Sequence, residues 1–158
     1  MSINYKVILR RNMINVLIDI LNEIKKNGLK EGNHLYITFE TDNKNTKVVK
    51  WLKEKFPKKM TIVIQYEYSN LEILKDKFKI SLSFNNIITN LTISYNSILS
   101  FFDPYANFGL ELTNEKSIEK KDKISKRNKK NINENNVINF EKFKKFKDKK
   151  LKSNTFPF

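Results

Sequence analysis

The sequence predicts an α+β fold that is mainly β, with an N-terminal helix followed by two packed antiparallel sheets. Two observations carry this prediction. Apolar residues recur at helical spacing in the first 27 residues, and short runs rich in β-branched and aromatic residues then follow one another to about residue 112. A third observation sets the end of the domain, because the composition changes abruptly to Lys, Asn, Glu and Ser at Asn114.

A helix is expected over residues 4–27. Leu9, Met13 and Leu17 belong to a series of apolar residues three and four positions apart, and Asn27-Gly28 follows as a stop signal. The series holds more apolar positions than the helix needs, because a sheet contacts only one face of a helix. Either a second subunit covers the excess, or the helix sits deeper in its own fold, and the periodicity favours neither.

The chain after this helix has the pattern of mostly antiparallel strands. Strands are expected at residues 34–41, 60–68, 78–84, 89–95 and 108–112, and short helical segments or turns at 46–56 and 97–102. Two of the strands are expected to pair as a hairpin around Asn85-Asn86, whereas residues 70–75 fit no single pattern. These elements give a domain of residues 1–113, which is large enough for a core of its own.

Residues 114–158 differ sharply from this domain. Residues 114–136 contain only three apolar residues, Ile118, Ile124 and Ile132, so they are expected to form a flexible charged linker within a disordered C-terminal tail. Residues 137–158 begin with a short motif of apolar and basic residues. Such a motif on a solvated tether is typical of a peptide that docks on a larger partner.

The formal net charge of +14 would suit a nucleic-acid-binding protein, and residues 114–158 carry +9 of it. However, Arg10, Arg11 and Arg127 are the only arginines, and Arg is the side chain best suited to bidentate contacts with phosphate and guanine. The charge therefore fits solvated, lysine-rich surfaces better than a nucleic-acid interface. A basic RNA-binding or ribosome-associated module stays the alternative function.

The sequence holds little that supports catalysis. It has no cysteine and a single histidine, His34, which argues against thiol catalysis, a cysteine-based zinc site and most dyads that use histidine. Its three glycines form no phosphate-binding loop. No metal, no cofactor and no enzymatic activity are expected. Since neither a membrane-spanning segment nor a secretory signal is visible, a cytoplasmic protein is expected.

Aromatic residues recur along the predicted strands, among them Phe39, Tyr66, Phe84 and Phe108. Such residues can stack on single-stranded nucleic acid, fill a core, or line a groove for an extended peptide. Periodicity alone does not separate these three interpretations.

Several segments, in their order and spacing, match a known family. They are Gly32–Phe39 (GNHLYITF), Phe56-Pro57, Met60–Gln65 (MTIVIQ), Ile80–Phe84, Leu91–Ile93, Phe101–Pro104 and Asn107–Leu110. With these segments the chain resembles SspB, the bacterial specificity-enhancing adaptor of the ClpXP protease, and in particular its alphaproteobacterial form. The resemblance covers about residues 5–112 and resumes at residues 137–145.

The resemblance implies a homodimer of mainly β domains, each an SspB-like, Sm-like barrel or sandwich, with the N-terminal helix at the subunit interface. The interface residues on that helix would be Met13, Leu17, Ile20 and Ile24. The resemblance also implies a groove for an extended peptide, typically the ssrA tag of stalled translation products. Gln65 matches the family's peptide-contacting glutamine, and the apolar wall of the groove would come from Phe39, Leu82 and Phe84.

The tail would then dock on the N-terminal domain of the ClpX unfoldase. The residues that match the family's docking motif are Val137, Ile138, Phe140, Glu141, Phe143, Lys144 and Lys145. Two departures stand out. Asn85-Asn86 occupies the place of the family's usual Gly-Gly, and a further basic segment, residues 146–158, follows the docking motif.

Overall fold

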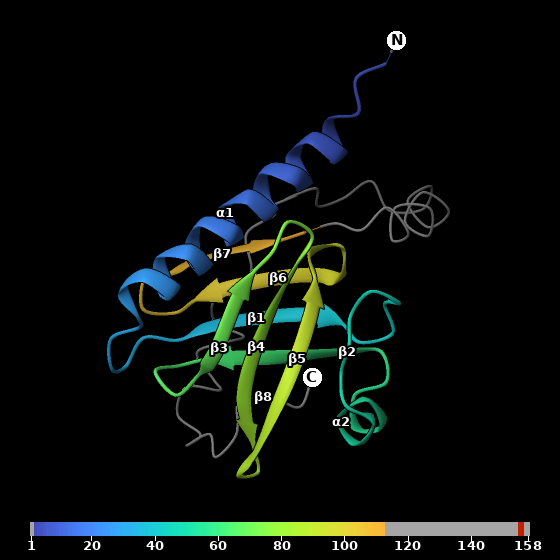
Figure 1. Cartoon of the computed structure of the whole chain (residues 1–158). Coiled ribbons are helices and arrows are strands. Elements are labelled where there is room, and N and C mark those ends of the chain that lie inside the picture. Colours follow the sequence, from blue (N-terminus) through green and yellow to red (C-terminus); the bar gives the residue numbers. More distant parts are fainter. Residues whose placement is uncertain (1, 113–154, 157–158) are drawn as a thin grey trace, which may run out of the picture.

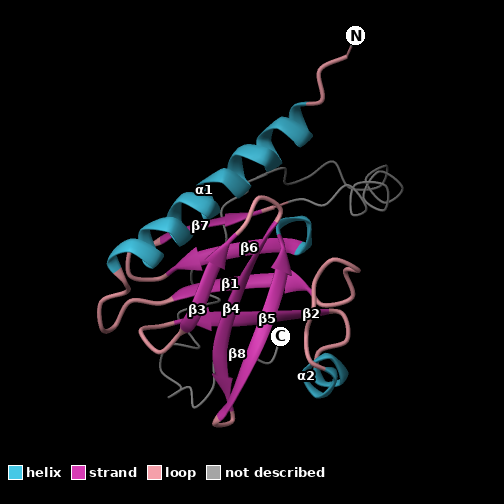
Figure 2. Cartoon of the chain, viewed as in Figure 1, coloured by secondary structure: helices cyan, strands magenta, loops and turns pink. Residues whose placement is uncertain are grey.

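The structure is a computed structural model that describes residues 2–112 and 155–156. Two antiparallel sheets pack face to face, and the long helix α1 (Tyr5–Asn27) crosses one side of them (Figure 1). Strands account for more of the described residues than helices do (Figure 2). The predicted α+β, mainly β class is therefore confirmed. The described strands form two separate sheets and no closed barrel, so the sandwich is the correct one of the two shapes that the resemblance implied.

The two sheets differ in size and in the way the chain builds them. The five-stranded sheet has the order β7-β6-β1-β2-β8, and the three-stranded sheet has the order β3-β4-β5. The strands are β1 (Leu35–Glu40), β2 (Lys59–Ile64), β3 (Ser69–Ile73), β4 (Lys77–Phe84), β5 (Ile87–Ser94), β6 (Ile98–Asp103), β7 (Phe108–Glu111) and β8 (Thr155–Phe156). Every paired strand runs antiparallel to its neighbour.

The core lies between the sheets and is closed by α1. On β1, Leu35, Ile37 and Phe39 point into it, as the two-residue period of a strand requires. Four buried side chains of α1, Met13, Leu17, Leu21 and Ile24, complete the same cluster at spacings of four, four and three. These spacings put them in one row along the helix, so this row is what holds α1 to the sheets.

Polar contacts fix α1 near both of its ends. The Asn4 side chain caps the helix by accepting a hydrogen bond from the Val7 amide at 3.1 Å. Near the far end, the Tyr68 hydroxyl donates to the Ile24 carbonyl at 3.0 Å, and Gly28 takes a positive φ of 72° just after the last residue. The predicted helix and its stop at Asn27-Gly28 are thus confirmed.

Three predicted elements differ from the structure. Residues 97–102, expected as a helix or turn, are mostly strand β6, which follows a single 3-10 turn at Tyr95–Ser97. Phe101 and Phe102 lie on opposite faces of this strand and both are buried, so its apolar run does not alternate. The strand expected at 60–68 ends at Ile64, and the helix expected at 46–56 shortens to α2 (Lys50–Lys55).

The β4–β5 hairpin is confirmed, and its turn explains the departure from the family's glycines. Phe84 pairs with Ile87, so Asn85 and Asn86 form a two-residue connection. Their φ angles are 51° and 64°. A two-residue turn with both φ angles positive matches the right-handed twist of a hairpin, and asparagine is the non-glycine residue that adopts it most readily.

Candidate functional site

The side of β2 that faces away from β1 is the first candidate site, because an extended chain can add to a strand through backbone hydrogen bonds. One side of β2 is paired with β1 along its whole length, from Lys59 opposite Glu40 to Ile64 opposite Leu35. On the other side the described partner is the short strand β8, which pairs only with Thr61 and Ile62. The strand continues along this side to Ile64, and Gln65 is the next residue.

Gln65, the predicted peptide-contacting residue, is the first residue after β2 and is half-buried. An amide side chain both donates and accepts hydrogen bonds, so at the end of an edge strand it can pair with the backbone of an extended ligand. The neighbouring Tyr66 is exposed, and the Glu67 carboxylate beside it raises the pKa of its phenol. Contact between Gln65 and a ligand stays a prediction.

The three residues predicted to form the apolar wall lie in the core. Phe39 on β1 pairs with Met60 near the start of β2, so it is five strand residues, or roughly 16 Å, from the Gln65 end of that strand pair. Leu82 and Phe84 belong to β4 of the other sheet. All three side chains are fully buried in the same cluster, and a role in peptide binding stays a prediction for them.

The tip of the β4–β5 hairpin carries exposed apolar residues that the sequence analysis did not single out. Ile87 is 54% exposed and Ile88 is 76% exposed, next to the turn at Asn85 and Asn86. In Figure 1 this hairpin runs past the β2 side of the five-stranded sheet. From the sequence, two neighbouring isoleucines in a strand are expected to be core residues. Their place at the tip of the hairpin is what identifies them as surface residues.

A second apolar row lies on the face of the five-stranded sheet that points away from the core. Phe102 of β6, Tyr36 of β1 and Val63 of β2 stand in register across three strands and are buried, although they are not part of the core cluster. The rings of Tyr36 and Phe102 are 6.2 Å apart, and His34 stacks on Tyr36 at 6.3 Å. Burial raises the pKa of the Tyr36 phenol.

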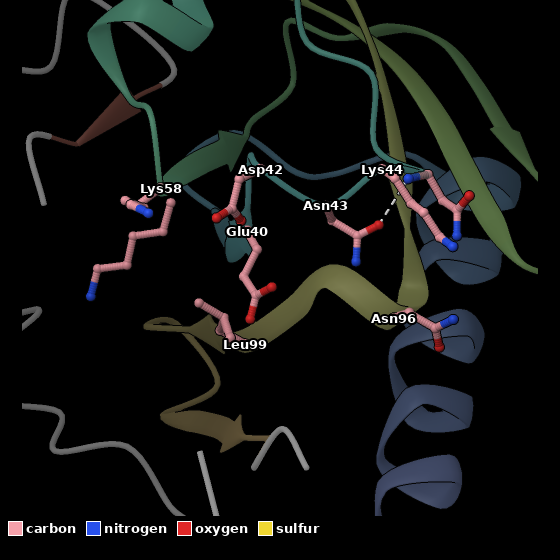
Figure 3. A pocket seen from close by; sticks show the side chains of 9 residues that line it. Glu40, Asp42, Asn43, Lys44, Lys58, Asn96 and Leu99 are labelled. Carbon is pink, nitrogen blue, oxygen red and sulfur yellow. Dashed lines mark hydrogen bonds between the residues drawn. The ribbon is translucent and has the colours of Figure 1, made fainter. Parts of the chain in front are cut away.

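A polar hollow of about 760 Å³ opens at the other end of the β1–β2 pair (Figure 3). It is lined by Glu40, Asp42, Asn43, Lys44, Asn45, Lys58, Lys59, Asn96 and Leu99. Its charges are mixed, and the Asn43 side chain is held by the Asn45 amide at 2.9 Å. None of the predicted site residues lines it. No group of three or more metal-ligating side chains occurs within residues 2–112.

The predicted interface residues of α1 divide into two sets. Met13, Leu17 and Ile24 are buried in the core of their own chain, and Ile20 is partly buried against it. A separate row of apolar residues on α1 faces solvent: Tyr5, Leu9 and Val16 are 73%, 48% and 37% exposed. Leu9 follows Tyr5 by four residues and Val16 follows Leu9 by seven, so this row lies on one side of the helix and reaches Ile20 four residues later. We refer to Tyr5, Leu9, Val16 and Ile20 as the exposed row of α1.

The comparison with protein families bears on the resemblance that the sequence segments suggested. Residues 8–155, nearly the whole chain, match the family described as SspB, Stringent starvation protein B. The chain belongs to the SspB family. A comparison with curated proteins gave no match. The resemblance inferred from residue segments is thereby confirmed at the level of the family.

SspB membership supports a general role as an adaptor of the ClpXP protease, and SspB is a family of adaptors and not of enzymes. No helix in the described part of the chain is long and apolar enough to cross a membrane. The family match continues beyond Leu112 to residue 155, so it includes residues 137–145. The docking residues predicted there, from Val137 to Lys145, lie outside the described residues, as does the boundary between linker and tail.

Proposed function

We propose that this protein is a cytoplasmic, homodimeric adaptor that binds ssrA-tagged peptides and tethers them to the ClpX unfoldase of the ClpXP protease. The observation that carries the proposal is the family match, because it spans both the β domain and the segment that contains Val137–Lys145. An adaptor needs these two parts, one for the substrate and one for the protease.

The β2 edge and Gln65 are the proposed place for the tag. An extended peptide can add to a strand edge through backbone hydrogen bonds, and nearby side chains then select its sequence. This side of β2 already pairs with an extended segment, β8, and Gln65 follows the last residue of β2. The exposed Ile87 and Ile88 supply apolar surface on the hairpin that runs past this edge.

The exposed row of α1 is the proposed dimer contact. Leu17 and Met13 already use their area in the core, so they can add little to a second interface. Leu9 and Val16 are 48% and 37% exposed, so they keep surface area for a second interface. The first turns of α1 also stand clear of the sheets (Figure 1). Of the four residues proposed from the sequence, Ile20 is the one that joins this row.

The dimer contact is tested by placing a carboxylate on each side of α1. Val16→Glu lies in the exposed row, and Asn22→Glu is exposed on the other side of the same helix. Sedimentation should show a dimer for the wild type and for Asn22→Glu, and a monomer for Val16→Glu. The reason is that burying an unpaired charge at an interface costs several kcal/mol. A Val16→Glu protein that sediments as the wild-type dimer would remove this row from the interface.

Tethering accounts for how two weak contacts deliver a substrate. A linker of residues 114–136 spans about 25 Å root-mean-square, and more if its charges repel one another. Once the tail docks on ClpX, the second contact becomes intramolecular at an effective concentration of roughly millimolar, so avidity rises ~10²–10⁴-fold.

The function is tested with ClpXP and a tagged substrate. The double variant Phe140→Ala/Phe143→Ala should bind an ssrA-tag peptide with the wild-type Kd but should no longer lower the KM for degradation. Phe146→Ala is the matched control, since it removes a tail aromatic outside the proposed motif. Equal stimulation by the double variant and the wild type would contradict the docking role. Absence of tag binding by the wild type would contradict the adaptor role itself.

A further inference from the structure

The strand β8 comes from the far end of the chain. Thr155 pairs with Ile62 and Phe156 pairs with Thr61, which places the C-terminal segment on the β2 edge. The preceding described residue, Leu112, follows β7 at the opposite edge of the same sheet. The two ends of the intervening segment are therefore held at opposite edges of the five-stranded sheet (Figure 1).

We propose that Thr155–Phe156 is a self-ligand that occupies the β2 edge in cis and competes there with the extended peptide. The proposal rests on the proposed function, since the competing peptide is the ssrA tag. Strand addition uses backbone groups that every peptide carries, so a tag and the chain's own C-terminal strand can use the same donors and acceptors of β2.

Several features make this strand replaceable. Its described part has two residues and two register pairs, whereas β1 pairs with the other side of β2 through six. Pro157 follows it directly, and proline has no N–H to continue a ladder. Thr155 is β-branched and suits a strand. The sequence thus favours a short extended segment that pairs and then stops.

The competition should be moderate in size. A tethered segment acts at an effective concentration of roughly millimolar. If the free segment binds with a Kd between about 0.1 and 1 mM, the apparent Kd of the tag rises about 2–10-fold, because only the open fraction of β2 edges accepts it. A tag that takes the edge would also release the C-terminal end of the segment that contains residues 137–145.

The test uses the full chain and three variants: deletion of residues 155–158, Thr155→Pro and Thr155→Val. Proline removes the backbone donor, whereas valine keeps the donor and the β-branched shape. Fluorescence anisotropy with a labelled ssrA-tag peptide should give a Kd about 2–10-fold lower for the deletion and for Thr155→Pro, and an unchanged Kd for Thr155→Val. Tag binding of wild-type strength in all three variants would overturn the competition and leave the proposed function intact.

Amide hydrogen exchange without any tag tests the cis strand independently. Exchange at Thr61 or Ile62 should become faster in the deletion and in Thr155→Pro and stay unchanged in Thr155→Val. Exchange rates that are the same in all variants would overturn the occupancy of the β2 edge by Thr155–Phe156. This conclusion would hold even if no variant bound the tag. Exchange that speeds up when the wild type is diluted would show that the strand comes from a second copy, which would overturn occupancy in cis.

Discussion

The five-stranded sheet ends in two unlike edges. At one, β7 pairs with β6 through four register pairs, a turn at residues 104–107 joins the two strands, and the Leu112 amide adds a hydrogen bond to the Leu99 carbonyl at 2.7 Å. At the other, β8 pairs with β2 through two register pairs and comes from the C-terminal end of the chain. The first edge is closed by a neighbour in sequence, and the second by a distant segment.

The difference separates a structural edge from an exchangeable one. Closing a short turn costs little chain entropy, and β6 is anchored in the core by Ile98 and Phe101. The two described residues of β8 lie at the end of a long connection, whose closure costs more chain entropy. The β2 edge is therefore the place where another extended chain can enter at low cost.

The largest expected effect is on the structural edge. Phe101 is fully buried and pairs with Leu110 of β7. Phe101→Ala should lower the free energy of unfolding by about 3–5 kcal/mol, because it leaves a cavity in the core. Deletion of residues 155–158 should change it by less than about 1 kcal/mol, since few hydrogen bonds are lost. Urea denaturation measures both, and similar losses for the two changes would refute the contrast between the edges.

Arg10 anchors α1 to the turn that precedes β6 and to the first residue of that strand. Its guanidinium donates to the carbonyls of Tyr95, Asn96 and Ile98 at 3.4, 3.2 and 3.1 Å. Arg10→Met should cost about 1.5–3 kcal/mol of stability, because charged hydrogen bonds are lost and partly buried carbonyls lose their donor. The adjacent Arg11 is exposed, so Arg11→Met should change thermal unfolding little. Equal losses from the two variants would argue that Arg10 has no anchoring role.

Gln65 tests the exchangeable edge. Gln65→Ala should weaken ssrA-tag binding about tenfold, since a hydrogen bond to a ligand contributes roughly 1 kcal/mol or somewhat more. Its unfolding transition should stay that of the wild type. Asn96→Ala, which removes an exposed amide from the polar hollow, is the matched control and should bind as the wild type does. An unchanged Kd in fluorescence anisotropy for Gln65→Ala would remove that residue from the site.

The smallest effect expected is a pH dependence at the turn before β6. Burial, with the nearby Asp76 carboxylate, raises the pKa of Tyr95 from 10.0 to about 12. Its hydroxyl donates to the Leu74 carbonyl at 3.1 Å, so Tyr95→Phe should cost roughly 1 kcal/mol at neutral pH.

The sign of this pH dependence follows from proton binding. Between pH 10 and 12 the folded state keeps the phenolic proton that the unfolded state releases, so stability falls as pH rises through this window. The stability difference between wild type and Tyr95→Phe should therefore narrow there. Urea midpoints at pH 8 and pH 11 give the comparison, and a difference that widens would contradict the raised pKa.

Much of the fold follows from local patterns in the sequence. The apolar spacing predicts α1 almost to the residue, and the alternation in residues 78–84 predicts β4, because the apolar face of each meets the core. The sequence does not predict β6, because Phe101 and Phe102 on its opposite faces are both buried, which removes the alternation on which a strand assignment depends. The pattern also places the end of β2 too late, because residues 65–68 still alternate although the strand ends at Ile64 and the chain leaves for the other sheet.

The candidate site was less accessible from sequence. The resemblance supplied Gln65, but the two-residue period could not separate a groove wall from a core, and Phe39, Leu82 and Phe84 are core residues. For α1, Leu17 and Val16 are both apolar and adjacent, and only the position of the sheets shows that the first is buried and the second exposed. The pairing of β8 depends on a contact between distant parts of the chain, which no local pattern reports.

Backbone amide NMR shifts on titration with an ssrA-tag peptide test the central claim most directly. The account predicts that shifts concentrate on β2 and Gln65 and spare β7. Shifts centred on β7 or on the polar hollow, or the absence of any shift at saturating peptide, would contradict it.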